Sequence, residues 1–443
     1  MRTMKESPLW DKALFICNTL QEKGFTAYIA GGAVRDSLLG VSPKDFDIAT
    51  DANTDDIERL FDDTYAVGKA FGTIVVNIDR SSFEVTRFRK DGEYKDGRRP
   101  ETVEFSVPEE DAKRRDFTIN ALFFDSKTDQ LIDFVGGQKD LNDGVLRFVG
   151  DAFSRIKEDK LRIMRGIRFV GQLGFLIDEQ GFSAIKEYSY ALPQVSTERI
   201  TTEFKKILSS KYSIAALSDF EAAGLLQVVY PELYMIWEKS VTGGFETEFR
   251  DPWTMAKLML QKAKVYNNQI FSIASFFAPF SYWVTETGSF QNWHSFLISK
   301  KYSKIESARI ENFMRHLNSM VEPLDLATIK RMYSESGGEL SRLSTHSHMG
   351  LFPIHKESQL LAQTYEEAHP PGLIELPRAY ITGKDMLALG AVKGKLLGEI
   401  LDEAFDLQLN GRITNRNEAL EWVENKIEEL REKEEIEYNK EDL

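Results

Sequence analysis

Two acidic residues separated by one position are the first feature of this sequence that could perform chemistry. Asp45 and Asp47 alternate with the apolar residues Phe46 and Ile48. In a strand, this alternation places both carboxylates on one face and both apolar side chains on the other. Because neighbouring carboxylates repel each other unless water or a cation screens them, the pair predicts a divalent-cation site of the phosphoryl-transfer kind. An ordinary solvent-exposed strand is the alternative.

A possible anion-binding turn precedes the acidic pair. Gly31 and Gly32 follow an apolar run that ends at Ala30, and Arg35 comes three residues later. A glycine pair between a strand and a helix lets backbone amides approach a phosphate without a Cβ in the way, and an arginine adds a charged fork. The glycines alone would indicate only a tight turn. With the acidic pair close by, the pattern predicts a phosphate site.

The positions of histidine and cysteine narrow the choice of metal. All six histidines lie at or beyond His294, and the single cysteine, Cys17, excludes an intrachain disulfide. Any metal before His294 must therefore be held by oxygen, which favours Mg²⁺ or Mn²⁺ over Zn²⁺. Glu84 is the candidate for a third carboxylate from a neighbouring strand. An exposed strand glutamate is an equally good interpretation of that residue.

A second polar group lies at the start of an apolar segment and consists of Arg115, Asp116 and Asn120. Arg115 could hold a triphosphate, while Asp116 and Asn120 could receive or orient a ribose hydroxyl. The plainer interpretation is the charged N-terminal signal of a helix.

Residues 158–168 predict a helix with polar side chains at intervals of three, namely Asp159, Arg162, Arg165 and Arg168. An exposed salt-bridge ladder, worth about 0.3–0.5 kcal/mol per pair, would explain the spacing. A base-reading site explains more, since a carboxylate accepts from the exocyclic amine of cytosine or adenine and an arginine donates to the adjacent ring nitrogen. Guanine and uracil present the reverse pattern and would leave buried polar groups unpaired.

The periodicity of the chain changes near residue 150. A helix over residues 9–23 and several strand-like runs precede this point, and from Ala152 onward the pattern is almost entirely helical. We therefore expect an α+β protein whose first module is mixed α/β. Frequent aromatic residues between 226 and 300 favour helix packing over base stacking. The predicted strands are 28–30, 45–49, 74–78, 83–89, 103–105, 121–124 and 131–134.

Composition limits the classes of partner. The net charge of −14 argues against a non-specific polyanion binder, so any nucleic acid must meet a local basic surface such as residues 155–168. No apolar run approaches the roughly eighteen residues of a membrane span, and the N-terminus lacks a signal-peptide apolar region. We expect a globular, cytoplasmic protein without a membrane partner.

Taken together, these motifs resemble the class II tRNA nucleotidyltransferases, the CCA-adding enzymes, which belong with bacterial poly(A) polymerases in the polymerase-β-like superfamily. Residues 89–100 are similar to the flexible loop that CC-only members lack, whereas Phe71 stands where many members carry histidine. The matching segments are 31–36 with Asp45 and Asp47, 84–89, 114–121, 158–169, and in the tail 381–386, 390–394 and 410–415.

The resemblance implies an elongated, seahorse-like architecture with four parts. These are a polymerase-β-like nucleotidyltransferase head (residues 1–150), a base-recognising neck (151–225), an RNA-binding body (226–372) and a tRNA-binding tail (373–443), with Pro370-Pro371-Gly372 as a linker. It also implies Mg²⁺ on Asp45 and Asp47. The implied nucleotide contacts come from Gly32, Arg35, Arg115, Asp159, Arg162, Arg165 and Arg168.

The same resemblance implies template-independent addition of CCA to the 3′ end of tRNA, with contact to the acceptor stem. Two Mg²⁺ ions, CTP and ATP take part, pyrophosphate is released, and no obligatory protein partner is evident. Three alternatives are open. An A-only-adding enzyme would share all these motifs, and a poly(A) polymerase should favour a basic RNA-gripping extension that this acidic chain does not offer. A non-catalytic RNA-binding protein would tolerate loss of the acidic pair, which is present.

Overall fold

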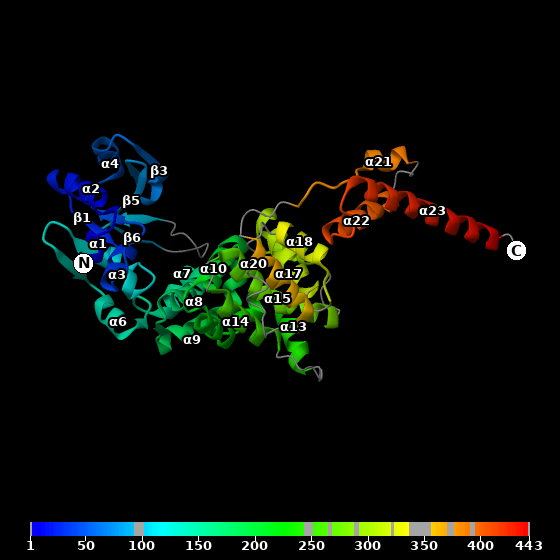
Figure 1. Ribbon diagram of the computed structural model, residues 1–443. Helices are drawn as coiled ribbons and strands as arrows, with labels where there is room; N and C mark the ends of the chain where they lie inside the picture. Colours follow the sequence, from blue (N-terminus) through cyan, green and yellow to red (C-terminus); the bar gives the residue numbers. More distant parts are fainter. Residues whose placement is uncertain are drawn as a thin grey trace. The chain divides into compact units, whose positions relative to one another are not determined.

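In the computed structural model the chain forms two compact units, Met1–Met235 and Ile236–Leu443. Their helices and strands are labelled in Figure 1. The predicted division into four parts is finer than this and stays a prediction. Among the described residues, no helix is long and apolar enough to cross a membrane. The structure describes residues 2–92, 102–242, 251–264, 268–287, 292–319, 323–335, 356–369, 376–389 and 395–441. Most of the loop predicted at 89–100, the linker at 370–372 and the tail glycines at 390–394 lie outside these ranges.

A seven-stranded sheet organises the first unit. Its order is β3-β4-β5-β2-β1-β8-β9, and every pair is antiparallel except β2 with β5, which is parallel. The predicted strands are all confirmed to within a few residues, although Asp45 lies just before its strand rather than in it. The strands are β1 (Ala27–Ala30), β2 (Asp47–Thr50), β3 (Thr64–Gly68), β4 (Thr73–Ile78), β5 (Ser81–Arg87), β8 (Leu122–Asp125) and β9 (Gln130–Asp133).

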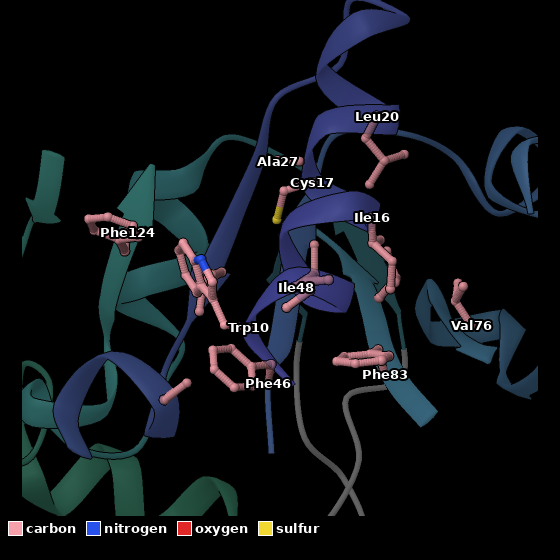
Figure 2. Packing of buried hydrophobic residues seen from close by; sticks show 14 of the residues in the cluster. Trp10, Ile16, Cys17, Leu20, Ala27, Phe46, Ile48, Val76, Phe83 and Phe124 are labelled. Atoms are coloured by element: carbon pink, nitrogen blue, oxygen red, sulfur yellow. The ribbon is translucent and has the colours of Figure 1, made fainter. Parts of the chain in front are cut away.

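One face of this sheet is covered by the helices α2 (Trp10–Glu22) and α4 (Thr54–Leu60). Figure 2 shows Trp10 of α2 close to Phe46 and Phe124, whose ring centroids lie 6.4 and 6.3 Å from its own. Burial raises the pKa of the Cys17 thiol to about 12, so this residue packs as a small apolar side chain. The helices therefore close one face of the sheet, and polar residues can collect on the other.

Shorter elements surround the open face. These are η1 (Lys69–Phe71), a hairpin of β6 (Arg89–Asp91) and β7 (Val103–Phe105), α5 (Pro108–Lys113), η2 (Thr118–Asn120) and α6 (Gly137–Asp143), while α3 (Gly32–Leu38) follows β1 directly. The strand β3 was not predicted. It is an edge strand with exposed Tyr65 and Val67, so its conformation comes from pairing with β4 and not from burial.

The helical part of the first unit contradicts one prediction, because residues 158–168 do not form a single helix. The helix α7 (Ala152–Glu158) ends before Asp159, whose backbone is extended at φ −140° and ψ 106°, and α8 (Leu161–Leu173) begins two residues later. The Asp159 carboxylate accepts a hydrogen bond of 3.0 Å from the Leu161 backbone N–H, at the start of the new helix. Local side-chain bonding of this kind competes with helix continuation.

Further helices complete the first unit. They are α9 (Glu179–Tyr188), η3 (Ser189–Gln194), α10 (Thr197–Ser209), α11 (Ser213–Ala222), α12 (Leu225–Val229) and the start of α13 (Pro231–Thr242). A short parallel pair, β10 (Val145–Leu146) with β11 (Leu176–Ile177), was not predicted.

The described part of the second unit is helical. Trp253 and Phe276 are buried and meet edge to face at 5.8 Å, which confirms helix packing as the role of these aromatic residues. Gly398 lies inside α22. The helices are α14 (Pro252–Ala263), α15 (Gln269–Thr287), α16 (Trp293–Ser299), α17 (Lys304–Ser319), α18 (Leu326–Glu335), α20 (Lys356–Ala368), α21 (Gly383–Ala388), α22 (Lys395–Leu409) and α23 (Arg416–Glu441).

Replacing Gly137 with alanine should destabilise the first unit. The added Cβ would lie 2.1 Å from the carbonyl oxygen of Thr118, the first residue of η2. Overpacking of this kind costs about 1–3 kcal/mol, which thermal unfolding would detect. Gln138→Ala, at the exposed neighbouring position, is the control and should change the melting temperature little. Equal melting temperatures for the two variants would contradict the packing described here.

Candidate active site

A cleft of about 880 Å³ in the first unit collects the residues singled out in the sequence. It lies on the face of the sheet opposite α2 and α4, between the strands and α8. All of the predicted catalytic and nucleotide-binding residues line it, although they come from segments far apart in the chain. They are Gly31, Gly32, Arg35, Asp45, Asp47, Glu84, Arg115, Asp116, Asn120, Asp159, Arg162, Arg165 and Arg168.

Carboxylates meet where β2 runs parallel to β5. Asp47 and Glu84 are direct neighbours in the register of these strands, and Asp45 precedes β2. The Asp47 carboxylate is accessible to water but surrounded by the cleft walls. Its removal from bulk solvent raises its pKa to about 6, with repulsion by Glu84 and Asp45 acting in the same direction and Arg115 acting against it. The site therefore concentrates negative charge.

The oxygen-only donor set of this group suits Mg²⁺, which is commonly bound through one or two carboxylates together with substrate phosphates. Within the described residues, no cluster of three or more acidic, histidine or cysteine side chains is arranged to hold a metal ion. Asp45 and Asp47 remain the predicted ligands, and Glu84 lies beside them.

The glycine turn places Arg35 in the cleft. Gly31 has φ +68°, a conformation that favours glycine, and a Cβ there would lie 3.0 Å from Nη1 of Arg115. Arg35 lies on the short helix α3 that follows. Its guanidinium donates to Asp36 Oδ1 and, at 2.6 Å, to Asn120 Oδ1. The turn therefore allows the side chains of Arg35 and Arg115 to approach the backbone of Gly31 and Gly32.

A buried acidic residue that the sequence analysis did not single out orients Arg115. Asp111 forms ion pairs with Arg115 at 3.0 Å and with Arg114 at 2.6 Å. Burial alone would raise its pKa, but the two guanidinium groups hold the pKa of this carboxyl below its usual range. The spacing of three and four residues from Asp111 to Arg114 and Arg115 is a local signal that could have identified it.

Asp116 is held by α8. Its carboxylate forms an ion pair with Arg165 and accepts hydrogen bonds from the Phe117 backbone and the Asn120 amide. Although burial opposes ionisation, Arg165 and these hydrogen bonds hold the pKa of Asp116 at about 2. Asp116 is therefore ionised at neutral pH and fixes both the arginine and the amide.

Phe169 is a second residue that sequence reasoning missed. Its buried ring lies 5.3 Å from the guanidinium carbon of Arg35, 5.7 Å from that of Arg165 and 4.2 Å from that of Arg168. The face of an aromatic ring attracts cations, so the Phe169 ring stabilises three neighbouring arginines.

Glu203 of α10 was also missed by sequence reasoning. It forms a 2.7 Å ion pair with Arg168.

The predicted base-reading pair lies at the break between α7 and α8. Asp159 is paired with Arg199 of α10 at 2.9 Å, and Arg162 donates to Glu158 and to the backbone carbonyl of Arg155. The intrahelical ladder that served as the alternative is therefore not the arrangement found for Asp159, because its partner comes from another helix. Arg199 was not predicted, since a contact across forty residues leaves no local pattern.

Two family models match segments of the first part of this chain. Residues 27–147 match the poly A polymerase head domain, and residues 174–236 match the probable RNA and SrmB-binding site of polymerase A. A CCA-adding enzyme of Ligilactobacillus salivarius is 33% identical over 430 residues, which cover 95% of this chain and 97% of the relative. One of Bacillus subtilis is 34% identical and covers 93% and 97%.

The chain belongs to the CCA-adding enzymes. With another CCA-adding enzyme, from Geobacillus sp., it shares 47% identity over 223 residues, which span half of this chain and 54% of the relative. The solved structure of the Bacillus stearothermophilus CCA-adding enzyme in complex with CTP is 27% identical, covers 97% of this chain and 99% of its own, and has a TM-score of 0.73. A Thermotoga maritima CCA-adding enzyme complexed with tRNA, at 19% identity and TM-score 0.61, shares the fold.

Replacing Asp47 with asparagine should stabilise the protein in a pH-dependent way. Because the pKa of Asp47 is raised from 3.8 to about 6, its ionisation costs folding free energy that appears as pH rises through this window. In a chelator, the melting temperatures of wild type and variant should agree at pH 4 and diverge to a constant difference above pH 6, with the variant higher. Asp62→Asn, exposed and outside the cleft, is the control. Parallel curves for Asp47→Asn and wild type would contradict the electrostatic description.

Proposed function

We propose that this chain adds C, C and A in turn to the 3′ end of tRNA, using CTP and ATP and releasing pyrophosphate. The observation that carries the proposal is the convergence of Asp45 and Asp47 with the arginines of α3 and α8 in one cleft. The near full-length similarity to CCA-adding enzymes supports the same conclusion. Two Mg²⁺ ions are part of the proposal, with Asp45 and Asp47 as their ligands.

The side chains of the cleft divide the work of nucleotidyl transfer. When bound beside Asp45 and Asp47, Mg²⁺ would acidify the acceptor hydroxyl and neutralise charge on the triphosphate. Arg35 and Arg115 carry guanidinium forks that bind phosphate oxygens, and their pairing with Asn120 and Asp111 presets their directions. No side chain needs to act as a general base, because positioning and charge neutralisation supply the catalysis.

Base selection is assigned to Asp159 and Arg162. The Asp159 carboxylate would accept from the exocyclic amine of cytosine or adenine, and Arg162 would donate to the adjacent ring nitrogen. Glu158 and Arg199 form ion pairs with Arg162 and Asp159, respectively. Each partner leaves hydrogen-bonding capacity unused, because a carboxylate has about four acceptor sites and a guanidinium five N–H groups. The pair can therefore read a base without breaking its ion pairs.

The remaining parts of the chain are assigned by the same proposal. Residues 151–225 serve as the base-recognising neck, 226–372 as an RNA-binding body and 373–443 as a tail that binds tRNA. The compact core of the tail around Met386 and Val423 supports treating it as a module.

The reaction itself is tested with tRNA that lacks its last three nucleotides. We expect C and C to be added with CTP alone and A to follow when ATP is also present, as gel electrophoresis at single-nucleotide resolution would show. Asp45→Ala should abolish incorporation while leaving the melting temperature close to that of wild type. Addition only after CC is supplied would support an A-only enzyme, and an unlimited A tail would support a poly(A) polymerase. Absence of pyrophosphate release in every condition would support a non-catalytic RNA-binding protein.

Asp159→Asn should relax base selection. The amide can present N–H groups to the carbonyl of uracil, which the carboxylate repels, so the preference for CTP over UTP should fall about tenfold or more. The ratio of kcat/KM values for the two nucleotides measures this. Asp62→Asn, which makes the same chemical change at an exposed position outside the cleft, is the matched control. An unchanged ratio in Asp159→Asn would remove this residue from base selection.

A further inference from the structure

The cleft has two chemically different ends, and strand order separates them. β2, with Asp47, lies between β1 on one side and β5 on the other. On the β1 side are the glycine turn and Arg35. On the β5 side the sheet continues through β4 to the edge strand β3, and Val67, Phe71, Thr73 and Thr86 line the cleft there. The strand register carries Glu84 and Thr86 on the same face as Asp47.

The in-line geometry of nucleotidyl transfer requires the nucleotide and the RNA acceptor to occupy different ends of the cleft. The attacking and leaving oxygens lie on opposite sides of the phosphorus, so the acceptor hydroxyl must enter from the side away from the departing pyrophosphate. Arg35 and Arg115, whose guanidinium groups suit pyrophosphate, lie on the β1 side beside the glycine turn. The acceptor strand therefore approaches over β5, β4 and β3.

We propose that Thr73, Thr86, Val67 and Phe71 form the subsite that holds the 3′-terminal nucleotide of the RNA acceptor. The inference rests on the proposed function and names a part of the cleft that the nucleotide-binding residues do not use. Thr73 and Thr86 hydrogen-bond the terminal ribose, and Val67 and Phe71 provide the apolar surface beside it.

The two threonines have the hydrogen-bonding capacity that a ribose requires. They are directly paired in the register of β4 and β5, and their Oγ1 atoms are 3.1 Å apart. Since only one hydroxyl donates in that contact, the pair retains one donor and several lone pairs. Both side chains are partly exposed at the cleft, beside Glu84. A 2′-hydroxyl, which both donates and accepts, is the RNA-specific partner of such a pair.

The other side chains at this end favour sugar and base over phosphate. Val67 lines the cleft and is 64% exposed, so its apolar surface is accessible to a ligand there. Arg89 forms an ion pair with Asp91 at 3.2 Å and donates to the Phe71 carbonyl at 2.6 Å. Arg89 therefore has a carboxylate partner of its own, whereas Arg114 and Arg115 share the single carboxylate of Asp111.

The threonine pair is tested with an acceptor tRNA whose terminal nucleotide is 2′-deoxy. In wild type, the missing hydroxyl should raise the KM for tRNA about fivefold, the size of one hydrogen bond. In the double variant Thr73→Val/Thr86→Val, ribo and deoxy acceptors should have the same KM, and the KM for CTP should stay within about twofold of wild type. Thr64→Val is the control, because its strand partner Val76 belongs to the core on the opposite face. It should retain the preference for the ribose. An equal deoxy penalty in the double variant and wild type would overturn the assignment.

The apolar surface is tested with Val67→Asp, which should raise the KM for tRNA at least tenfold and leave the KM for CTP unchanged. Val41→Asp changes an exposed valine outside the cleft and should leave both constants unchanged. Thermal unfolding checks that each variant is folded. If wild type adds no nucleotide, the proposed function fails. If wild type is active and Val67→Asp binds tRNA normally, the subsite alone is wrong.

Discussion

Charge balance inside the cleft is the constraint on which the rest of the site depends. Arginines gathered on one wall repel each other, and each needs a partner if it is to hold a fixed direction without substrate. Asp111, Asp116 and Glu203 are such partners, all of them buried. Removing one partner of a buried pair leaves an uncompensated charge, so these acidic residues preserve the geometry of the arginines. Catalysis by positioning requires this preorganisation.

The acidic wall is built in the opposite way. Asp47 and Glu84 are adjacent on parallel strands, and their mutual repulsion contributes to the raised pKa of Asp47. Because a divalent cation relieves the repulsion between these carboxylates, its binding free energy is more favourable here than at a neutral site. The sheet tolerates this because its other face buries a continuous apolar cluster under α2 and α4. The buried apolar face thus stabilises the sheet, and the opposite face carries the repelling carboxylates of the cleft.

The break at Asp159 brings one more carboxylate to the cleft. An uninterrupted helix would have kept Asp159 on the helix surface, beside Arg162 and Arg165. The extended backbone instead places its carboxylate against Arg199 of α10 and leaves it at the cleft. Strand order adds a second asymmetry, because the glycine turn after β1 and the exposed valine of β3 lie on opposite sides of the acidic pair. The cleft is therefore chemically different at its two ends.

Residue types and short spacings determined much of this protein by themselves. The alternation around Asp45 and Asp47, the glycine pair before Arg35, the polar group at Arg115, Asp116 and Asn120, and the three-residue spacing from Asp159 to Arg168 predicted residues that line the cleft. The change of period near residue 150 predicted the helical remainder. Tertiary structure alone decided which charges meet. Arg199 and Glu203 form ion pairs with residues far away in the sequence, Phe169 lies near Arg35 of α3, and the edge strand β3 is held by pairing with β4. Such contacts depend on distances through space, which no periodicity along the chain records.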